Sequence, residues 1–124
     1  MQNKIAYQGS KICFGTSFLF SLMGMSTLAT APYQGMGMLL TSVTSMLYHY
    51  KGGKMLRKID FTVNVTLGSY FTVVAIQNGK WLVPGFALLT LTGYYVTKKY
   101  PLLPPDVMHS LCVHVPTLCG FAFV

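Results

Sequence analysis

Five uncharged apolar stretches follow one another along this chain, each roughly 17 residues long, and short basic or turn-forming segments separate them. A helix of roughly 17 residues is about 26 Å long, close to the hydrocarbon thickness of a bilayer, which is about 30 Å. Each stretch is therefore expected to be a short transmembrane helix. The stretches cover residues 12–28, 35–50, 61–77, 81–97 and 107–124.

The connections between the stretches contain residues that stop helices, for example Pro32 in the first, Gly52 and Gly53 in the second, and Gly79 in the third. The stretches themselves are rich in glycine, serine and threonine, which allow helices to approach closely in lipid. The sequence therefore predicts an all-α membrane protein: a compact bundle of about five short transmembrane helices forming a single transmembrane domain over residues 1–124.

Composition separates this chain from most soluble proteins. Apolar residues make up 52% of the sequence and charged residues only 9%, with a net charge of +7. The basic residues lie between apolar stretches rather than on one face of a soluble core, so we exclude a nucleic-acid-binding protein and expect the lipid bilayer as the main partner. All three cysteines fall within apolar stretches, where they predict no disulfide framework.

The basic residues also predict an orientation. With five spans, the N-terminal tail and the second and fourth connections share one side of the membrane, and every Lys and Arg except Lys80 falls on that side. The positive-inside rule then places the N-terminus and the basic loops in the cytoplasm or its equivalent. Residues 29–31 match a signal-peptide cleavage site, but this charge segregation requires the first span to be retained.

A few ionisable residues within the predicted spans are candidates for a functional site. His49 ends the second span, Asp60 opens the third, and His109 and His114 lie in the first two turns of the fifth, all toward the basic side. Ser45 is one helical turn from His49. Three histidines would bind zinc, Asp60 would accept a proton from water, and Ser45 would hold that water or donate to an oxyanion.

The string Ser45-Met-Leu-Tyr-His49, followed by Asp60-Phe61 and by a histidine pair in the last span, resembles the CREST superfamily of membrane hydrolases. That superfamily includes the alkaline ceramidases and the progestin and adipoQ receptors. The resemblance implies a helical bundle that hydrolyses lipid amides with a zinc ion. By position, it implies His49, His109 and His114 as metal ligands, with Ser45 and Asp60 assisting the water.

The histidine pair departs from the HxxxH spacing of that superfamily, because here it reads His109-Ser-Leu-Cys-Val-His114. In an α-helix, residues four apart differ by about 40° around the axis, whereas residues five apart differ by about 140°. A straight α-helix would not direct both imidazoles at one ion. A kink or π-bulge beside Pro116, which lacks an N–H, would restore the phase.

Each candidate residue also has an interpretation without chemistry. His49 lies between Tyr48 and Tyr50 and fits an interfacial aromatic belt, while Asp60 fits the cap of a helix start. Two functions therefore remain open. One is a minimal zinc-dependent hydrolase of lipid amides or esters. The other is a non-catalytic structural membrane subunit of a larger assembly, such as a virion membrane or an organellar membrane complex, which the short spans and small loops favour.

Overall fold

The computed structural model describes residues 10–100 and 102–124, and over these residues it contains helices and no strand. The all-α prediction is therefore confirmed. The elements are α2 (Lys11–Thr27), α3 (Pro32–Lys51), α4 (Lys54–Gln77), α5 (Leu82–Lys99), α6 (Pro105–His109), the π-helical turn η1 (Ser110–His114) and α7 (Val115–Ala122). The last three, α6, η1 and α7, follow one another without a break and form one continuous helix, which we call the C-terminal helix.

Local chemistry accounts for several helix ends. Ser10 caps α2, because its side chain accepts a hydrogen bond from the Cys13 backbone N–H at 3.2 Å. Pro32 is the first residue of α3, where its missing N–H costs nothing. Gly52 and Gly53 separate α3 from α4 with φ angles of 72° and 101°, a region that residues with a Cβ rarely adopt.

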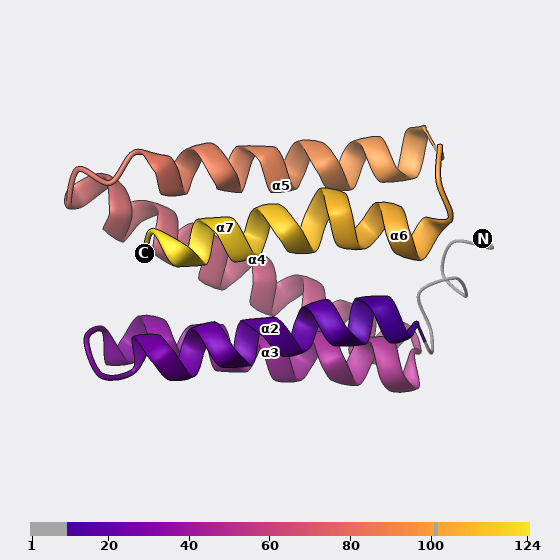
Figure 1. The fold of residues 1–124 in the computed structure, drawn as a ribbon, viewed down its shortest axis with the longest axis horizontal. Helices are drawn as coiled ribbons and strands as arrows, with labels where there is room; N and C mark the ends of the chain where they lie inside the picture. The colour runs from indigo at the N-terminus through magenta and orange to yellow at the C-terminus, as the bar shows by residue number, and fades with distance from the viewer. Residues whose placement is uncertain (1–9, 101) are drawn as a thin grey trace.

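The helices alternate in direction and form a bundle (Figure 1). Helices α2 and α3 make an antiparallel hairpin, the C-terminal helix packs beside α5, and α4 crosses between these pairs. The start of α2, the end of α3, the start of α4, the end of α5 and the start of α6 consequently lie at one end of the bundle, on the right in Figure 1. We call this the basic end, because it carries Lys11, Lys51, Lys54, Arg57, Lys58, Lys98 and Lys99.

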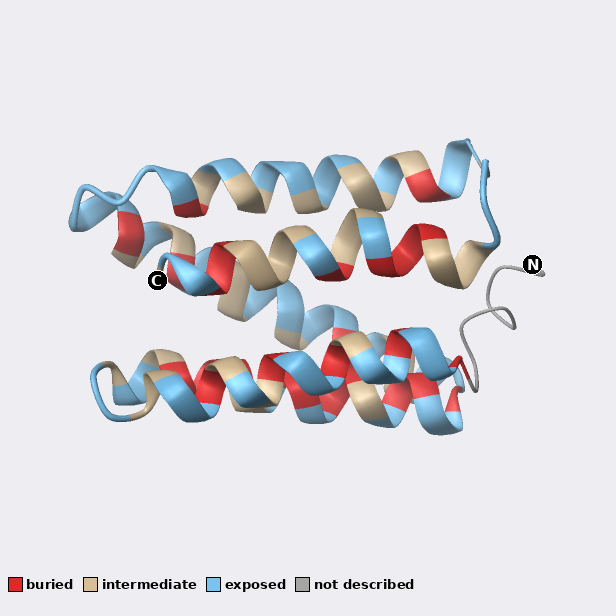
Figure 2. Cartoon of the chain, in the orientation of Figure 1, coloured by how far each residue is buried: buried red, intermediate tan, exposed pale blue. Residues whose placement is uncertain are grey.

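Figure 2 shows how far each residue is buried. The residue types at the buried and exposed positions are the reverse of those in most water-soluble bundles. Many of the largest apolar side chains are exposed, among them Leu88 and Leu91, each 66% exposed. The buried apolar cluster is small. Buried positions also include many hydroxyl and imidazole side chains, namely Ser10, Ser17, Thr41, Ser42, Thr44, Ser45, His49, Thr97, His109, Ser110 and His114.

Helices α2 and α3 approach each other closely at two glycines. A Cβ on Gly35 would lie 2.8 Å from the backbone oxygen of Gly24, and a Cβ on Gly24 would lie 2.9 Å from that of Gly35. Hydroxyl groups link the same helices: Ser42 donates to the Ser17 carbonyl at 2.8 Å, and the Ser17 and Ser45 hydroxyls lie 2.8 Å apart. Small residues and interhelical hydrogen bonds therefore hold this hairpin together.

Helix α4 is longer than the sequence predicted. It begins at Lys54 rather than near Phe61, because the helix-favouring residues after Gly53 continue directly into the apolar stretch. Asp60 consequently lies well inside α4 and does not cap it, which corrects its expected position at the start of the helix. Among the helices of the described residues, α4 is the one whose length and mean hydropathy of 1.4 suit it to cross a membrane.

Candidate metal centre and cavity

Three histidines from separate helical segments meet near the basic end of the bundle. His49 lies in the last turn of α3, His109 ends α6 and His114 ends η1. One ligand atom from each lies within 4.8 Å of the other two. The ring centroids are 5.4 Å apart for His49 and His109, 5.2 Å for His49 and His114, and 4.7 Å for His109 and His114. All three side chains are buried, and we call them the histidine cluster.

The π-helical turn η1 brings His109 and His114 to the same side of the C-terminal helix. Its hydrogen bonding is widened by one residue, as shown by the Val115 N–H, which donates to the Ser110 carbonyl. A spacing of five residues therefore completes about one turn here, whereas in an α-helix it overshoots. The π-bulge considered from the sequence is thus present.

A close contact with α5 accompanies this turn. Pro116 has no N–H, so the Cys112 carbonyl lacks the donor that an α-helix would give it four residues later. That carbonyl lies against Gly93 of α5, where a Cβ would come within 1.8 Å of the Cys112 oxygen. Only glycine fits at position 93 with the two backbones this close. The bulged turn therefore packs against a glycine that is distant in sequence.

Thr16 of α2 orients the His114 imidazole. The Thr16 hydroxyl is within hydrogen-bond distance of His114 Nδ1, and also lies 3.0 Å from the Ile12 carbonyl oxygen and 3.1 Å from that of Cys13. We assign the proton to Nδ1 of His114, with Thr16 Oγ1 as its acceptor, because an imidazole that binds a metal donates its other ring N–H. This assignment leaves His114 Nε2 as the nitrogen that can bind a metal.

Ser45 and Asp60 are both buried, and each has defined hydrogen-bond partners. Ser17 donates to a backbone carbonyl, so the 2.8 Å contact between the two serine hydroxyls is made with Ser45 as donor. The Asp60 carboxylate accepts hydrogen bonds from the Thr44 hydroxyl at 3.3 Å and from the Asn64 amide at 3.2 Å. Asn64 and Asp60 are four residues apart in α4, so this contact joins side chains on successive turns of one helix.

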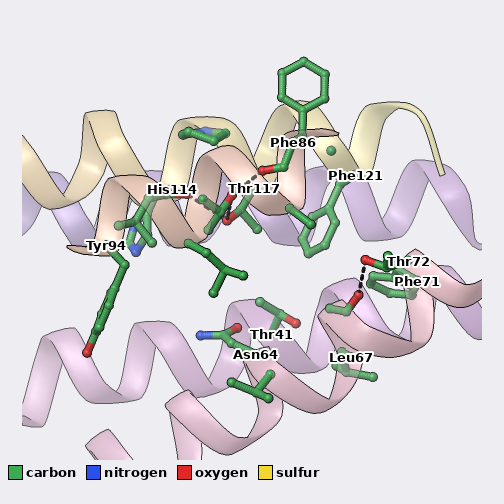
Figure 3. Close-up of a pocket in the computed structure, with 18 of the residues that line it drawn as sticks. Thr41, Asn64, Leu67, Phe71, Thr72, Phe86, Tyr94, His114, Thr117 and Phe121 are labelled. Carbon is green, nitrogen blue, oxygen red and sulfur yellow. Dashed lines mark hydrogen bonds between the residues drawn. The ribbon is translucent and has the colours of Figure 1, made fainter. Parts of the chain in front are cut away.

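The predicted residues Ser45, Asp60, His109 and His114 all line one cavity of about 980 Å³, whereas His49 is fully buried beside it. The cavity lies between α3, α4, α5 and the C-terminal helix. Figure 3 shows its change in character: His114 and Tyr94 lie toward one end, and Phe71 and Phe121 lie toward the other. Lining residues toward the basic end include Ser45, Tyr48, Arg57, Asp60, Phe61, Asn64, Tyr94, Thr97, Lys98, His109 and His114.

The donor set of the histidine cluster suits a divalent metal. Neutral imidazole nitrogens bind zinc and other late first-row metals well. In a tetrahedral zinc site with Zn–N distances of about 2.0–2.1 Å, ligand nitrogens are about 3.4 Å apart. The three nitrogens here lie within 4.8 Å of one another, so binding a common ion would draw them closer by up to about 1.4 Å.

Sequence reasoning missed four residues that contribute to this region. Thr16 supports His114, Gly93 admits the bulged turn, and the cations Arg57 and Lys98 stand on the cavity wall. Thr16 and Gly93 are unremarkable small residues among many, so no local signal distinguishes them. Arg57 and Lys98 were interpreted as determinants of membrane orientation and not as residues of a cavity.

Comparisons with protein-family models, with curated proteins and with solved structures find no match to this chain. The chemistry of the histidine cluster and of its cavity is therefore the basis on which a function is inferred.

Proposed function

We propose that this chain is an integral membrane protein that hydrolyses amide or ester bonds of lipids, with a zinc ion held by His49, His109 and His114. The observation that carries this proposal is the meeting of three buried histidines beside a largely apolar cavity that Ser45 and Asp60 also line. It agrees with the function that the resemblance to the CREST membrane hydrolases implies. The histidines that would bind the metal, the carboxylate that would accept a proton and the cavity that would hold the lipid therefore lie together.

The surface supports a membrane location. Large exposed apolar side chains such as Leu88 and Leu91 would be costly in water and are favourable against lipid chains. Serine and threonine hydroxyls donate to backbone carbonyls within the helices or bond across them, as expected where water is scarce. The clustering of cations at one end supports, by the positive-inside rule, an orientation with that end in the cytoplasm or its equivalent.

The chemistry divides among the named residues. His49, His109 and His114 would hold the zinc ion, which would supply a bound water with a pKa lowered to about 7. Asp60 is the acceptor for a proton from the attacking water. Because Ser45 donates to Ser17, its oxygen remains able to accept a hydrogen bond, which favours holding the water over donating to an oxyanion. Hydrolysis joins the water oxygen to the acyl carbon, and the departing amine or alcohol takes a proton.

The alternative of a non-catalytic subunit in a larger membrane assembly depended partly on the spacing of His109 and His114. The π-helical turn compensates for that spacing, since the two rings are 4.7 Å apart. A histidine pair that needs a bulged helix to meet is better explained by ligand binding than by packing, because π-bulges occur frequently at functional sites. We therefore favour the hydrolase.

The test combines metal content with turnover. Purified protein, prepared without chelators, is expected to contain about one zinc ion per chain by elemental mass spectrometry, and His49→Ala is expected to lose it. Asp60→Asn should keep the zinc and lose about 10²–10⁴-fold of the turnover of lipid amides or esters, since it removes only the proton acceptor. Ser26→Ala, which changes an exposed serine away from the cavity, is the control. Absence of zinc, or unchanged turnover in both variants, would overturn the proposal.

A further inference from the structure

Two cations stand on the wall of the cavity near the basic end. Arg57, in the first turns of α4, and Lys98, at the end of α5, both line it, whereas their sequence neighbours Lys58 and Lys99 do not. Lys98 Nζ lies 4.6 Å from the ring centroid of Tyr94, another lining residue, so the ammonium group is held at the cavity wall.

Arg57 and Lys98 stand at the same level of the bundle. The rings of Phe61 on α4 and Tyr94 on α5 are 6.2 Å apart between centroids. Arg57 is four residues before Phe61, and Lys98 is four residues after Tyr94. Because the two helices are antiparallel, each cation therefore lies one helical turn beyond this ring pair, in the direction of the basic end.

The carboxylates of the described residues already have neutral partners. Asp60 accepts from Thr44 and Asn64, and Asp106 accepts from Ser10 and from the Val107 backbone N–H. The chain has only these two acids against nine bases. The positive charge on the cavity wall is therefore available to an anion that enters from outside the chain.

The cavity continues from these cations along the bundle into mainly apolar surroundings, where the hydroxyls of Ser69, Thr72, Thr90 and Thr117 donate to backbone carbonyls of their own helices. Its lining on α4 runs from Arg57 to Val73, a rise of about 24 Å at 1.5 Å per residue. The part beyond Asn64 extends about 14 Å, close to the depth of one leaflet of a bilayer, about 15 Å. Phe71 and Phe121 pack edge to face with ring centroids 5.6 Å apart in this apolar part. This order of cations, histidine cluster and apolar space matches a lipid with an anionic head and one long chain.

We propose that the cavity recognises single-chain lipids that carry a phosphate headgroup, with the phosphate between Arg57 and Lys98 and the acyl chain directed toward Phe71 and Phe121. A phosphate monoester carries a charge of about −1.5 to −2, which two cations balance, and a guanidinium group binds phosphate through paired hydrogen bonds. This inference deepens the proposed function by naming its substrate class, and it depends on that function only for the bond that is cleaved.

The experiment measures binding without turnover. The full chain is placed in nanodiscs of phosphatidylcholine, and the probes are radiolabelled 1-O-octadecylglycerol 3-phosphate and its uncharged counterpart 1-O-octadecylglycerol. Both probes have an ether bond, which an amide or ester hydrolase does not cleave. Empty nanodiscs correct for partition into lipid. The test variants are Arg57→Gln and Lys98→Gln, which change residues that line the cavity. The matched control variants are Lys58→Gln and Lys99→Gln, which change neighbouring residues that do not line it.

We expect the phosphate probe to bind at least roughly tenfold more tightly than the neutral probe, as a charge-assisted hydrogen bond predicts. Arg57→Gln and Lys98→Gln should each remove most of this preference and leave binding of the neutral probe unchanged. Lys58→Gln and Lys99→Gln, which remove the same charge from the same end, should retain it. Equal binding of both probes, or an equal loss in all four variants, would overturn the inference.

The outcomes separate this inference from the proposed hydrolase. A preference for the phosphate probe in protein that turns over no lipid would uphold the binding site and refute the hydrolase. Turnover of neutral lipid amides without any preference for the phosphate probe would uphold the hydrolase and refute the headgroup site. Far-ultraviolet circular dichroism of each variant verifies that the helices are retained.

Discussion

Substitution of Gly93 tests whether the contact between α5 and the π-helical turn holds the histidine cluster together. The Cβ of an alanine at this position would lie 1.8 Å from the Cys112 oxygen and 2.7 Å from the Cys112 carbonyl carbon. Real Cβ contacts essentially never fall below 3.0 Å, so the oxygen and the Cβ must separate by at least about 3.0 − 1.8 = 1.2 Å. Both atoms belong to, or are fixed to, backbone, so no side-chain rotation relieves the clash.

The magnitude follows from this displacement. Overpacking costs about 1–3 kcal/mol, and a clash between backbones should lie at the upper end, about 3 kcal/mol. Metal ligands must keep their distances within about 0.2 Å, so displacing the turn that carries His114 away from α5 should also weaken metal binding. Gly93→Ala is therefore expected to lose both stability and zinc.

The assay is unfolding in denaturing detergent together with zinc content by elemental mass spectrometry. Gly85→Ala is the control, because Gly85 lies in the same helix and a Cβ there meets nothing within 4 Å. That control should be unchanged or more stable by up to about 1 kcal/mol, since alanine is the better helix former. If Gly93→Ala matched Gly85→Ala in both stability and zinc content, the close contact would not be what positions the histidines.

Two further substitutions test the supporting contacts. Thr16→Val keeps the shape of the side chain and removes the oxygen that accepts from His114, so zinc affinity measured by chelator competition should fall about 10–100-fold; an unchanged affinity would contradict the proposed orientation. Gly35→Ala would place a Cβ 2.8 Å from the Gly24 backbone oxygen and should lower the unfolding free energy by about 1–3 kcal/mol. Gly15→Ala, where a Cβ meets nothing within 4 Å, should be neutral, and equal stability of these two glycine variants would refute the close-packing argument.

The helical nature of the chain could be predicted from the sequence because it depends on local pattern. Long uncharged apolar stretches favour helices, and the turn residues Pro32, Gly52 and Gly53 mark ends that the structure reproduces closely. The third predicted stretch begins at residue 61, whereas α4 begins at Lys54. Gly52 and Gly53 interrupt the helical conformation only briefly, and the basic residues that follow them also favour a helix. Membrane insertion and sidedness remain predictions from composition and charge.

The histidine cluster was predicted as a set of residues but not as a geometry. The sequence placed His49, His109 and His114 toward one end, because His49 and His109 are close to the ends of their predicted spans and His114 lies within the first two turns of the fifth span. Whether two histidines five residues apart could meet depended on the hydrogen-bonding pattern of one turn, which the sequence left open between an α-helix and a π-bulge. The structure has the π-helical turn, with the Cys112 carbonyl against Gly93.

The sequence by itself determined which segments are helical, where most of them end and how charge is divided between the two ends of the bundle. The first two follow from residues within one or two turns of one another, and the third follows from the number of helices and their alternating direction. Only the tertiary structure decided that Thr16 supports His114 and that Arg57 and Lys98 face one cavity. Those relations join helices far apart in the chain, and they depend on how each helix is rotated about its own axis, which close packing fixes and local sequence does not.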